Sequence, residues 1–134
     1  MSERQACILV IDDEVHITRV VSLKLRNAGY AVLTAADGEE GYEQAVQHTP
    51  DLIITDLQMP YLTGIEMARK LRGHRATSRT PVIMLTARGF GLTQEDIAGT
   101  NIIEMISKPF GPSALLDRVN QLLEDTPSRG ADAA

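Results

Sequence analysis

The sequence predicts a doubly wound α/β domain, with five parallel strands and helices on both faces of the sheet. Five short runs rich in β-branched residues recur along the chain. Most of these runs are continuously apolar, as expected for strands that are covered on both faces. Segments with the apolar spacing of amphipathic helices separate them. The length of 134 residues suits one domain of this class, for which about 100–150 residues is usual.

The five expected strands are residues 7–11, 31–35, 52–55, 82–85 and 102–106. Because strands and helices alternate along the whole chain, each crossover is expected to be right-handed. The strand order 2-1-3-4-5, known as flavodoxin-like, is the natural choice at this length. This order places the first and third strands side by side in the middle of the sheet.

Five helices are expected between and after these strands. An apolar stripe from Ile17 to Ala28 marks the first, which ends at Gly29, where a left-handed cap belongs. Asp37 followed by Glu40 resembles a capping box and starts the second helix. The remaining three are marked by Ile65, Ala68 and Leu71, by Thr93 and Asp96, and by the leucine-rich segment after Gly111-Pro112.

Composition and charge exclude several classes of protein. A net charge of -5 argues against a general nucleic-acid binder. Cys7 is the single cysteine, so no disulfide can form within the chain. Residues 1–6 lack the apolar core of a signal peptide, and no apolar run approaches the ~20 residues of a membrane helix. We expect a cytoplasmic protein without membrane contact, with one domain over residues 1–124 and a flexible tail at 125–134.

Charged or polar side chains follow the expected strands at their carboxyl ends, where open α/β sheets bind ligands. Asp12 and Asp13 follow the first strand, Asp56 the third, Thr86 the fourth and Lys108 the fifth. The three carboxylates should therefore converge on one pocket. Two carboxylates about 5 Å apart repel each other by about 3 kcal/mol at an effective dielectric constant near 20. A hard divalent cation, Mg²⁺ or Mn²⁺, is expected to offset this repulsion.

This set of groups is typical of phosphoryl transfer. A carboxylate can attack phosphorus and form an aspartyl phosphate. A metal ion, the Lys108 ammonium and the Thr86 hydroxyl could stabilise the transferring group. Simpler interpretations exist for single residues, since Asp56 could cap a helix and Asp12-Asp13 could be the acids that favour a helix N-terminus. The joint pattern favours the chemical interpretation.

Four motifs occur in order at the expected strand ends: Ile11-Asp12-Asp13-Glu14, Asp56-Leu57-Gln58-Met59-Pro60 with Gly64, Leu85-Thr86-Ala87, and Lys108-Pro109-Phe110. Through them the chain resembles the receiver domain of response regulators, of the stand-alone type, over about residues 7–124. The resemblance implies that Asp56 accepts a phosphoryl group. It also implies that Asp12, Asp13, Asp56 and the backbone carbonyl of Gln58 bind Mg²⁺. Thr86 and Lys108 would contact the phosphoryl group, and the Lys108–Pro109 peptide bond would be cis.

The resemblance also draws attention to three residues with regulatory roles. Met105 occupies the position in the fifth strand where many receivers carry a Tyr or Phe that turns inward on activation. Because methionine is flexible, we hypothesise that Met105 is a weak switch or that output uses another surface. Gln58 and Arg88 lie two residues past Asp56 and Thr86, where they would tune the phosphoryl lifetime through access of water.

The expected function is therefore that of a phosphoacceptor in a two-component phosphorelay, which catalyses only its own phosphorylation and dephosphorylation. The implied partners are a sensor histidine kinase or histidine phosphotransfer protein and a downstream protein, with a phosphorylation-dependent dimer as a further expectation. Direct contact with nucleic acid is not expected.

Other classes of function stay open. One is a receiver-like interaction module that is not phosphorylated, and another is a phosphatase or phosphotransferase that passes through an aspartyl phosphate. A flavin-binding protein is disfavoured, because the segment after the first strand is acidic where phosphate binding favours Ser, Thr and Gly. A basic loop, defined by Arg72, His74, Arg75 and Arg79, is interpreted as a solvated surface.

Overall fold

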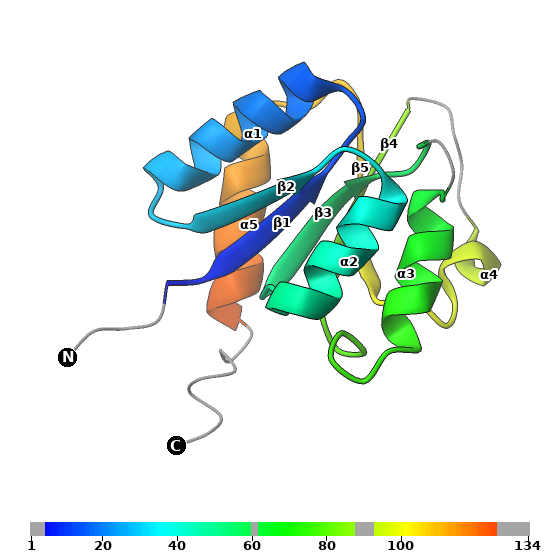
Figure 1. Ribbon diagram of the computed structural model, residues 1–134. Helices are drawn as coiled ribbons and strands as arrows, with labels where there is room; N and C mark the ends of the chain where they lie inside the picture. The colour runs from blue at the N-terminus through cyan, green and yellow to red at the C-terminus, as the bar shows by residue number, and fades with distance from the viewer. Residues whose placement is uncertain (1–4, 60–61, 88–92, 126–134) are drawn as a thin grey trace.

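The computed structural model describes residues 5–59, 62–87 and 93–125 and confirms the expected sheet (Figure 1). All strand pairs are parallel, and the order is β2-β1-β3-β4-β5. The strands are β1 (Cys7–Ile11), β2 (Ala31–Ala35), β3 (Leu52–Asp56), β4 (Val82–Thr86) and β5 (Ile102–Ser107). Strand β2 lies on one side of β1 and β3 on the other, so the carboxyl ends of β1 and β3 are neighbours.

Five helices flank the sheet: α1 (Val15–Asn27), α2 (Gly38–His48), α3 (Gly64–Arg72), α4 (Gln94–Ile97) and α5 (Pro112–Asp125). Helices α1 and α5 cover one face, while α2 and α3 cover the other (Figure 1). The expected helix starts are confirmed at Asp37, whose side chain accepts a hydrogen bond from Glu40 N, and at Thr93, which forms a full capping box with Asp96. Of the expected tail at 125–134, Asp125 is instead the last residue of α5, and residues 126–134 lie outside the described residues.

Helix α1 buries a narrower face than its apolar pattern predicts. The buried residues are Val21, Ser22 and Leu25, whereas Val20 is 43% exposed and Ala28 is also exposed. Successive residues of a helix point about 100° apart, so Val20 and its neighbour Val21 cannot both face the sheet. The helix ends at Asn27, and Gly29 adopts the left-handed conformation expected of a glycine cap, with φ +102°.

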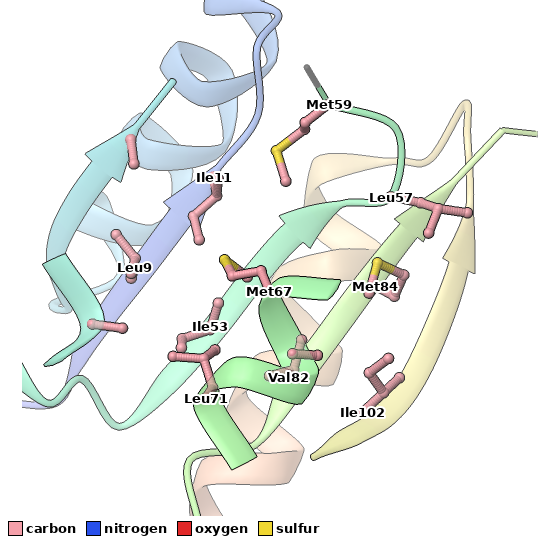
Figure 2. Packing of buried hydrophobic residues seen from close by; sticks show 13 residues of the cluster. Leu9, Ile11, Ile53, Leu57, Met59, Met67, Leu71, Val82, Met84 and Ile102 are labelled. Atoms are coloured by element: carbon pink, nitrogen blue, oxygen red, sulfur yellow. The ribbon is translucent and has the colours of Figure 1, made fainter. Parts of the chain in front are cut away.

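The core forms two layers, one on each face of the central strands. Side chains of β1, β3 and β4 alternate between the layers, because successive residues of a strand point to opposite faces. Figure 2 shows the layer on the α2–α3 side, in which Leu9, Ile53, Met67 and Met84 are fully buried. Burying each such side chain contributes about 1.5–3 kcal/mol to folding. This packing holds the strand ends that carry the site.

Strand β5 is less covered than its apolar sequence predicts. Ile103 is 49% exposed and Met105 is 41% exposed, although Ile102 belongs to the buried core. As the last strand in the order, β5 has a neighbour on one side only, and the adjacent helix α4 has just four residues. Continuous burial therefore holds for β1, β3 and β4, apart from the first residue of β1, and fails for β5.

Candidate functional site

Three carboxylates meet at the carboxyl edge of the sheet, as the sequence predicts. Asp12 and Asp13 directly follow β1, and Asp56 is the last residue of β3. Oxygen atoms from the three side chains all lie within 4.8 Å of one another. Asp12 and Asp56 are buried, with 1% and 7% of their surface exposed, while Asp13 is exposed. The two buried acids form the floor of the pocket and Asp13 its rim.

Lys108 brings a positive charge to these acids from the far side of the pocket. Its Nζ lies 3.1 Å from Asp12 Oδ2 and 3.1 Å from Asp56 Oδ1. The backbone N of Lys108 donates to Thr86 O at 2.7 Å, which fastens the end of β5 to the end of β4. The following Lys108–Pro109 peptide bond is cis, the isomer that the family resemblance implies.

The segment after Asp56 packs closely against Gly64, the first residue of α3. Gly64 N donates to Leu57 O at 2.8 Å. A Cβ atom at Gly64 would lie 2.5 Å from Asp56 O and 3.1 Å from Leu57 Cα. Since both are backbone atoms, neither could move aside without shifting Asp56 itself. Glycine at this position therefore allows α3 to approach the site and helps to fix the backbone of Asp56.

Burial and neighbouring charges shift the pKa values of the ionisable side chains in the pocket. Burial raises the pKa of Asp56, its hydrogen bond with Lys108 lowers it in part, and the Asp12 charge raises it again. Burial likewise raises the pKa of Asp12, against hydrogen bonds from the backbone of Glu14 and from Lys108. For Lys108, burial disfavours the ammonium, but hydrogen bonds to Asp56 and Asp12 outweigh it and raise the pKa. Ionisation of these two buried carboxylates therefore costs free energy, which their hydrogen bonds offset only in part.

The donor set fits a divalent cation of the magnesium type. Carboxylate oxygens are the ligands that such hard cations prefer, and Mg²⁺ commonly uses one or two carboxylates together with water and phosphate. Asp12, Asp13 and Asp56 provide these oxygens within one small volume. In the described part of the chain, Lys108 is the one cationic side chain paired with them. A single ammonium leaves the cluster net negative.

The other expected site residues differ in how close they lie to this cluster. Thr86 ends β4, is 5% exposed and is joined to Lys108 through the backbone. Gln58 is exposed two residues after Asp56. Met105 lies on β5, opposite Met84, with 41% of its surface exposed. Arg88 lies outside the described residues.

Glu14 is part of the pocket, although the sequence analysis assigns it no role. Its backbone N donates to Asp12 Oδ1 at 2.9 Å, and its Oε1 lies 3.3 Å from Lys108 Nζ. With 57% of its side chain exposed, it covers the lysine from the solvent side. In the sequence, this role was indicated only by the position of Glu14 in the acidic run that follows the first strand.

A groove of about 510 Å³ adjoins the pocket between α1 and the segment that joins β5 to α5. Its apolar wall is formed by Ile17, Val20, Val21, Pro109, Phe110 and Pro112. Glu14, His16 and Lys108 also line it. The groove therefore gives an apolar surface directly beside the acidic pocket, large enough to accept part of another protein.

A doubly wound parallel sheet with an acidic pocket and a lysine at its carboxyl edge defines the receiver class of signalling domain. The chain belongs to this family: the model described as "Response regulator receiver domain" matches residues 8–120. Response regulator receiver domains act in two-component systems. Across the described residues, no helix combines the length and apolar character needed to cross a membrane.

Solved structures support the same assignment. The chemotaxis response regulator CheY4 of Vibrio cholerae is 34% identical, with a TM-score of 0.81, over 88% of this chain and 98% of that one. The receiver domain of sensor histidine kinase PA1611 from Pseudomonas aeruginosa is 27% identical, with a TM-score of 0.78, over 88% and 97% of the two chains. That receiver has a magnesium ion coordinated in its active-site cleft.

Curated relatives extend beyond the region that matches. The DNA-binding dual master transcriptional regulator RpaA of Synechocystis is 41% identical over 121 residues, covering 89% of this chain and 49% of that protein. The transcriptional regulatory protein SrrA of Staphylococcus aureus is 36% identical, covering 90% and 49%. The chain thus spans about half the length of these relatives.

Proposed function

We propose that Asp56 accepts a phosphoryl group from a phosphohistidine of a partner protein, with Mg²⁺ bound beside it, and that the aspartyl phosphate switches a protein-binding surface. The observation that carries this proposal is the position of Asp56. It is buried at the centre of the acidic cluster, with Lys108 Nζ 3.1 Å from its Oδ1. A carboxylate so placed can act as a nucleophile towards a group held between it and the lysine.

In the proposed reaction, an Asp56 carboxylate oxygen forms a bond to phosphorus while the bond from phosphorus to the imidazole nitrogen of the donor breaks. The electron pair of the broken bond stays with the imidazole, which takes up a proton. Lys108 offsets charge on the phosphoryl oxygens, and the Thr86 hydroxyl donates a hydrogen bond to one of them. The same pocket would release inorganic phosphate when water attacks the phosphorus.

Asp12, Asp13, Asp56 and the backbone carbonyl of Gln58 would hold the Mg²⁺ ion. When bound, it supplies charge neutralisation for the transferring phosphoryl group. Asp13 is the exposed member of the set, so it can bind an ion that arrives from solvent without rearrangement of the core. Asp12, held by Glu14 N and Lys108, keeps its carboxylate oriented toward the cluster.

The apolar groove beside the pocket is the proposed contact surface for the phosphodonor, a sensor histidine kinase or histidine phosphotransfer protein. Its apolar wall could bury part of a partner helix while the histidine reaches Asp56. We further propose a cytoplasmic location, where such donors present their phosphohistidine. No activity on a separate substrate is proposed: the chain catalyses only its own phosphorylation and dephosphorylation. Output passes to a downstream protein or through a dimer, and, in a longer chain, to transcription as the names of RpaA and SrrA suggest.

The deciding experiment is intact-mass measurement after incubation with phosphoramidate, in the presence and absence of Mg²⁺. The wild type should gain one phosphoryl group only when Mg²⁺ is present. Asp56→Asn should gain none, because its amide is a poor nucleophile. The matched control is Asp117→Asn on the exposed surface of α5, which should react as the wild type does.

A folded wild-type protein that gains no phosphoryl group, beside a receiver that does under the same conditions, would contradict the proposal and favour an interaction module. Steady release of phosphate from a phosphorylated metabolite would instead favour a phosphatase.

The regulatory roles of single residues can be tested on the phosphorylated protein. Gln58→Ala and Arg88→Ala should change the rate of dephosphorylation if these residues control access of water. Met105→Ala should leave the rate of phosphorylation unchanged but alter phosphorylation-dependent dimerisation or partner binding. Unchanged binding would exclude coupling through the Met105 side chain.

A further inference from the structure

Charge is strongly segregated along this chain. Between Glu66 and Glu95 the sequence contains six of the thirteen Lys and Arg residues and none of the eighteen Asp and Glu residues. The rest of the chain is therefore far more acidic than the net charge of -5 suggests. The basic loop, defined above by Arg72, His74, Arg75 and Arg79, lies within this acid-free segment; it starts at the last residue of α3 and ends before β4.

The basic loop has a fixed internal structure. Thr77 is fully buried, and its hydroxyl donates to Leu71 O at 2.7 Å. Its carbonyl oxygen accepts a hydrogen bond from Asn101 Nδ2 at 2.9 Å, which ties the loop to the start of β5. Ala76 N donates to His74 Nδ1 at 3.1 Å. These hydrogen bonds fix the backbone positions of the charged residues, so little backbone freedom is lost when a ligand binds.

Three arginines of this loop are exposed, and none of them has an acidic partner among the residues that the structure describes. Arg72 uses Nη1 to bind Ser78 O at 3.0 Å, and Arg75 and Arg79 are exposed beside it. Throughout the described part of the chain, no carboxylate lies within ion-pair distance of any of the three. By contrast, Arg118 pairs with Glu104 at 2.9 Å. The loop thus offers unpaired guanidinium groups on a protein that is acidic overall.

The loop lies at the edge of the sheet opposite to the phosphorylation site. In Figure 1 it runs between the end of α3 and the start of β4, away from the arrowheads of the strands. The acidic pocket lies at the arrowhead ends, because Asp12 and Asp56 follow or end their strands. A molecule bound to the loop would leave both the pocket and the neighbouring apolar groove free.

We propose that the basic loop is a docking site for a short acidic peptide segment of a partner protein, bound whether or not Asp56 is phosphorylated. Arginine binds carboxylates through two parallel hydrogen bonds, which gives both strength and orientation. Three exposed arginines match a segment with a few successive Asp or Glu side chains. The site would tether a partner at one end of the domain while phosphoryl transfer takes place at the other.

The acidic surroundings favour a short peptide over a nucleic acid. Helix α2 packs beside α3, where Lys70 Nζ of α3 lies 4.4 Å from the centre of the Tyr42 ring of α2. The same helix α2 carries Glu39 and Glu43 on its exposed surface. A nucleic acid that extends from the loop along α2 would bring its phosphates towards these carboxylates, which repel them. A short acidic segment ends before it meets them.

The test is fluorescence anisotropy with fluorescein-labelled hexaglutamate as the probe. The variant Arg72→Gln/Arg75→Gln/Arg79→Gln removes the three charges of the loop. The matched control, Arg19→Gln/Lys24→Gln/Arg26→Gln on α1, changes the net charge equally. We expect the loop variant to bind the probe at least about tenfold more weakly, since it loses the charge-assisted hydrogen bonds of all three arginines. The control should bind within about twofold of the wild type, because its charges lie elsewhere. Beryllofluoride should leave the affinity unchanged.

Several results would overturn the proposal. Equal binding by the wild type and the loop variant would do so, as would equal weakening in the α1 control. Tighter binding of a thymidine hexanucleotide than of hexaglutamate would assign the loop to nucleic acid instead. Dimerisation that is lost in the loop variant would assign it to a second copy of the chain. If the triple variant does not fold by circular dichroism, the exposed single variant Arg75→Gln replaces it, with an expected loss of about threefold in affinity.

Discussion

Charged side chains are buried at one edge of the sheet and exposed at the other. At the carboxyl edge, Asp12 and Asp56 are almost fully buried and share one lysine. At the amino edge, the arginines of the basic loop are exposed and unpaired among the described residues. Both arrangements rest on the same scaffold, since β4 runs from the basic loop to the pocket.

This difference shows where charge costs stability and where it does not. A buried carboxylate loses its hydration and must be compensated by a cation or by hydrogen bonds. An exposed arginine keeps its hydration, so its presence has little effect on folding. A pocket that keeps uncompensated acids is suited to bind a cation and a phosphoryl group, and an exposed basic surface is suited to bind another molecule.

The largest effect is expected from glycine substitutions. Gly64→Ala would place Cβ 2.5 Å from Asp56 O, and should lower the free energy of unfolding by about 3 kcal/mol, because the contact is with backbone. Gly73→Ala, at the start of the basic loop, meets nothing closer than 3.7 Å and should change it by less than about 0.5 kcal/mol. Urea unfolding measures both. Similar losses in the two variants would show that the carboxyl edge is not tightly packed.

The next effect concerns the cations of the two edges. Lys108→Ala removes the partner of two buried carboxylates and should lower the free energy of unfolding by about 2–3 kcal/mol at neutral pH without Mg²⁺. Arg79→Ala in the basic loop should change it by less than about 0.5 kcal/mol. Thermal unfolding in the presence of a chelator distinguishes the two. If Lys108→Ala left the free energy of unfolding unchanged, solvent and not the lysine would compensate the buried carboxylates.

The pH dependence of the free energy of unfolding should show that burial disfavours the ionised form of Asp56. The pKa of Asp56 in the folded protein is raised, chiefly by burial, so the native state binds this proton more tightly than the unfolded state does. Its stabilising contribution is present below the unfolded pKa and is lost as pH rises through the folded pKa. Asp56→Asn should therefore unfold like the wild type in acid and be more stable at neutral pH, by about 1 kcal/mol.

This comparison requires chelator, because Mg²⁺ would stabilise the ionised wild type by binding to it. Denaturant unfolding at a series of pH values provides the measurement. An Asp56→Asn variant that is less stable than the wild type at neutral pH would show that Lys108 overcompensates for burial.

The smallest effect is expected at Glu14. Its carboxylate contacts Lys108 at 3.3 Å but is 57% exposed, so the pair is largely solvated. Glu14→Gln should change the free energy of unfolding by less than about 0.5 kcal/mol. Calorimetric unfolding of both proteins measures the difference. A loss comparable to that of Lys108→Ala would place Glu14 among the residues that hold the lysine.

Much of the fold could be predicted from local pattern. The bounds of all five strands were predicted within one residue. For β1, β3 and β4 this is because a buried parallel strand must be apolar on both faces. Helix starts at Asp37 and Thr93 were predicted because capping depends on residues three positions apart. The exposure of Val20 and of Met105 could not be predicted in this way. Both depend on which elements pack nearby, and the apolar character of a residue does not reveal its neighbours.

The sequence by itself determined the order of strands and helices and the polar residues that follow each strand, because these depend on neighbours along the chain. It also determined the acid-free segment around the basic loop. Only the tertiary structure decided that Asp12 and Asp56 are both within 3.1 Å of Lys108, that Glu14 joins them, and that the basic loop lies at the opposite edge. Residues nearly a hundred positions apart meet there because parallel strands align their carboxyl ends.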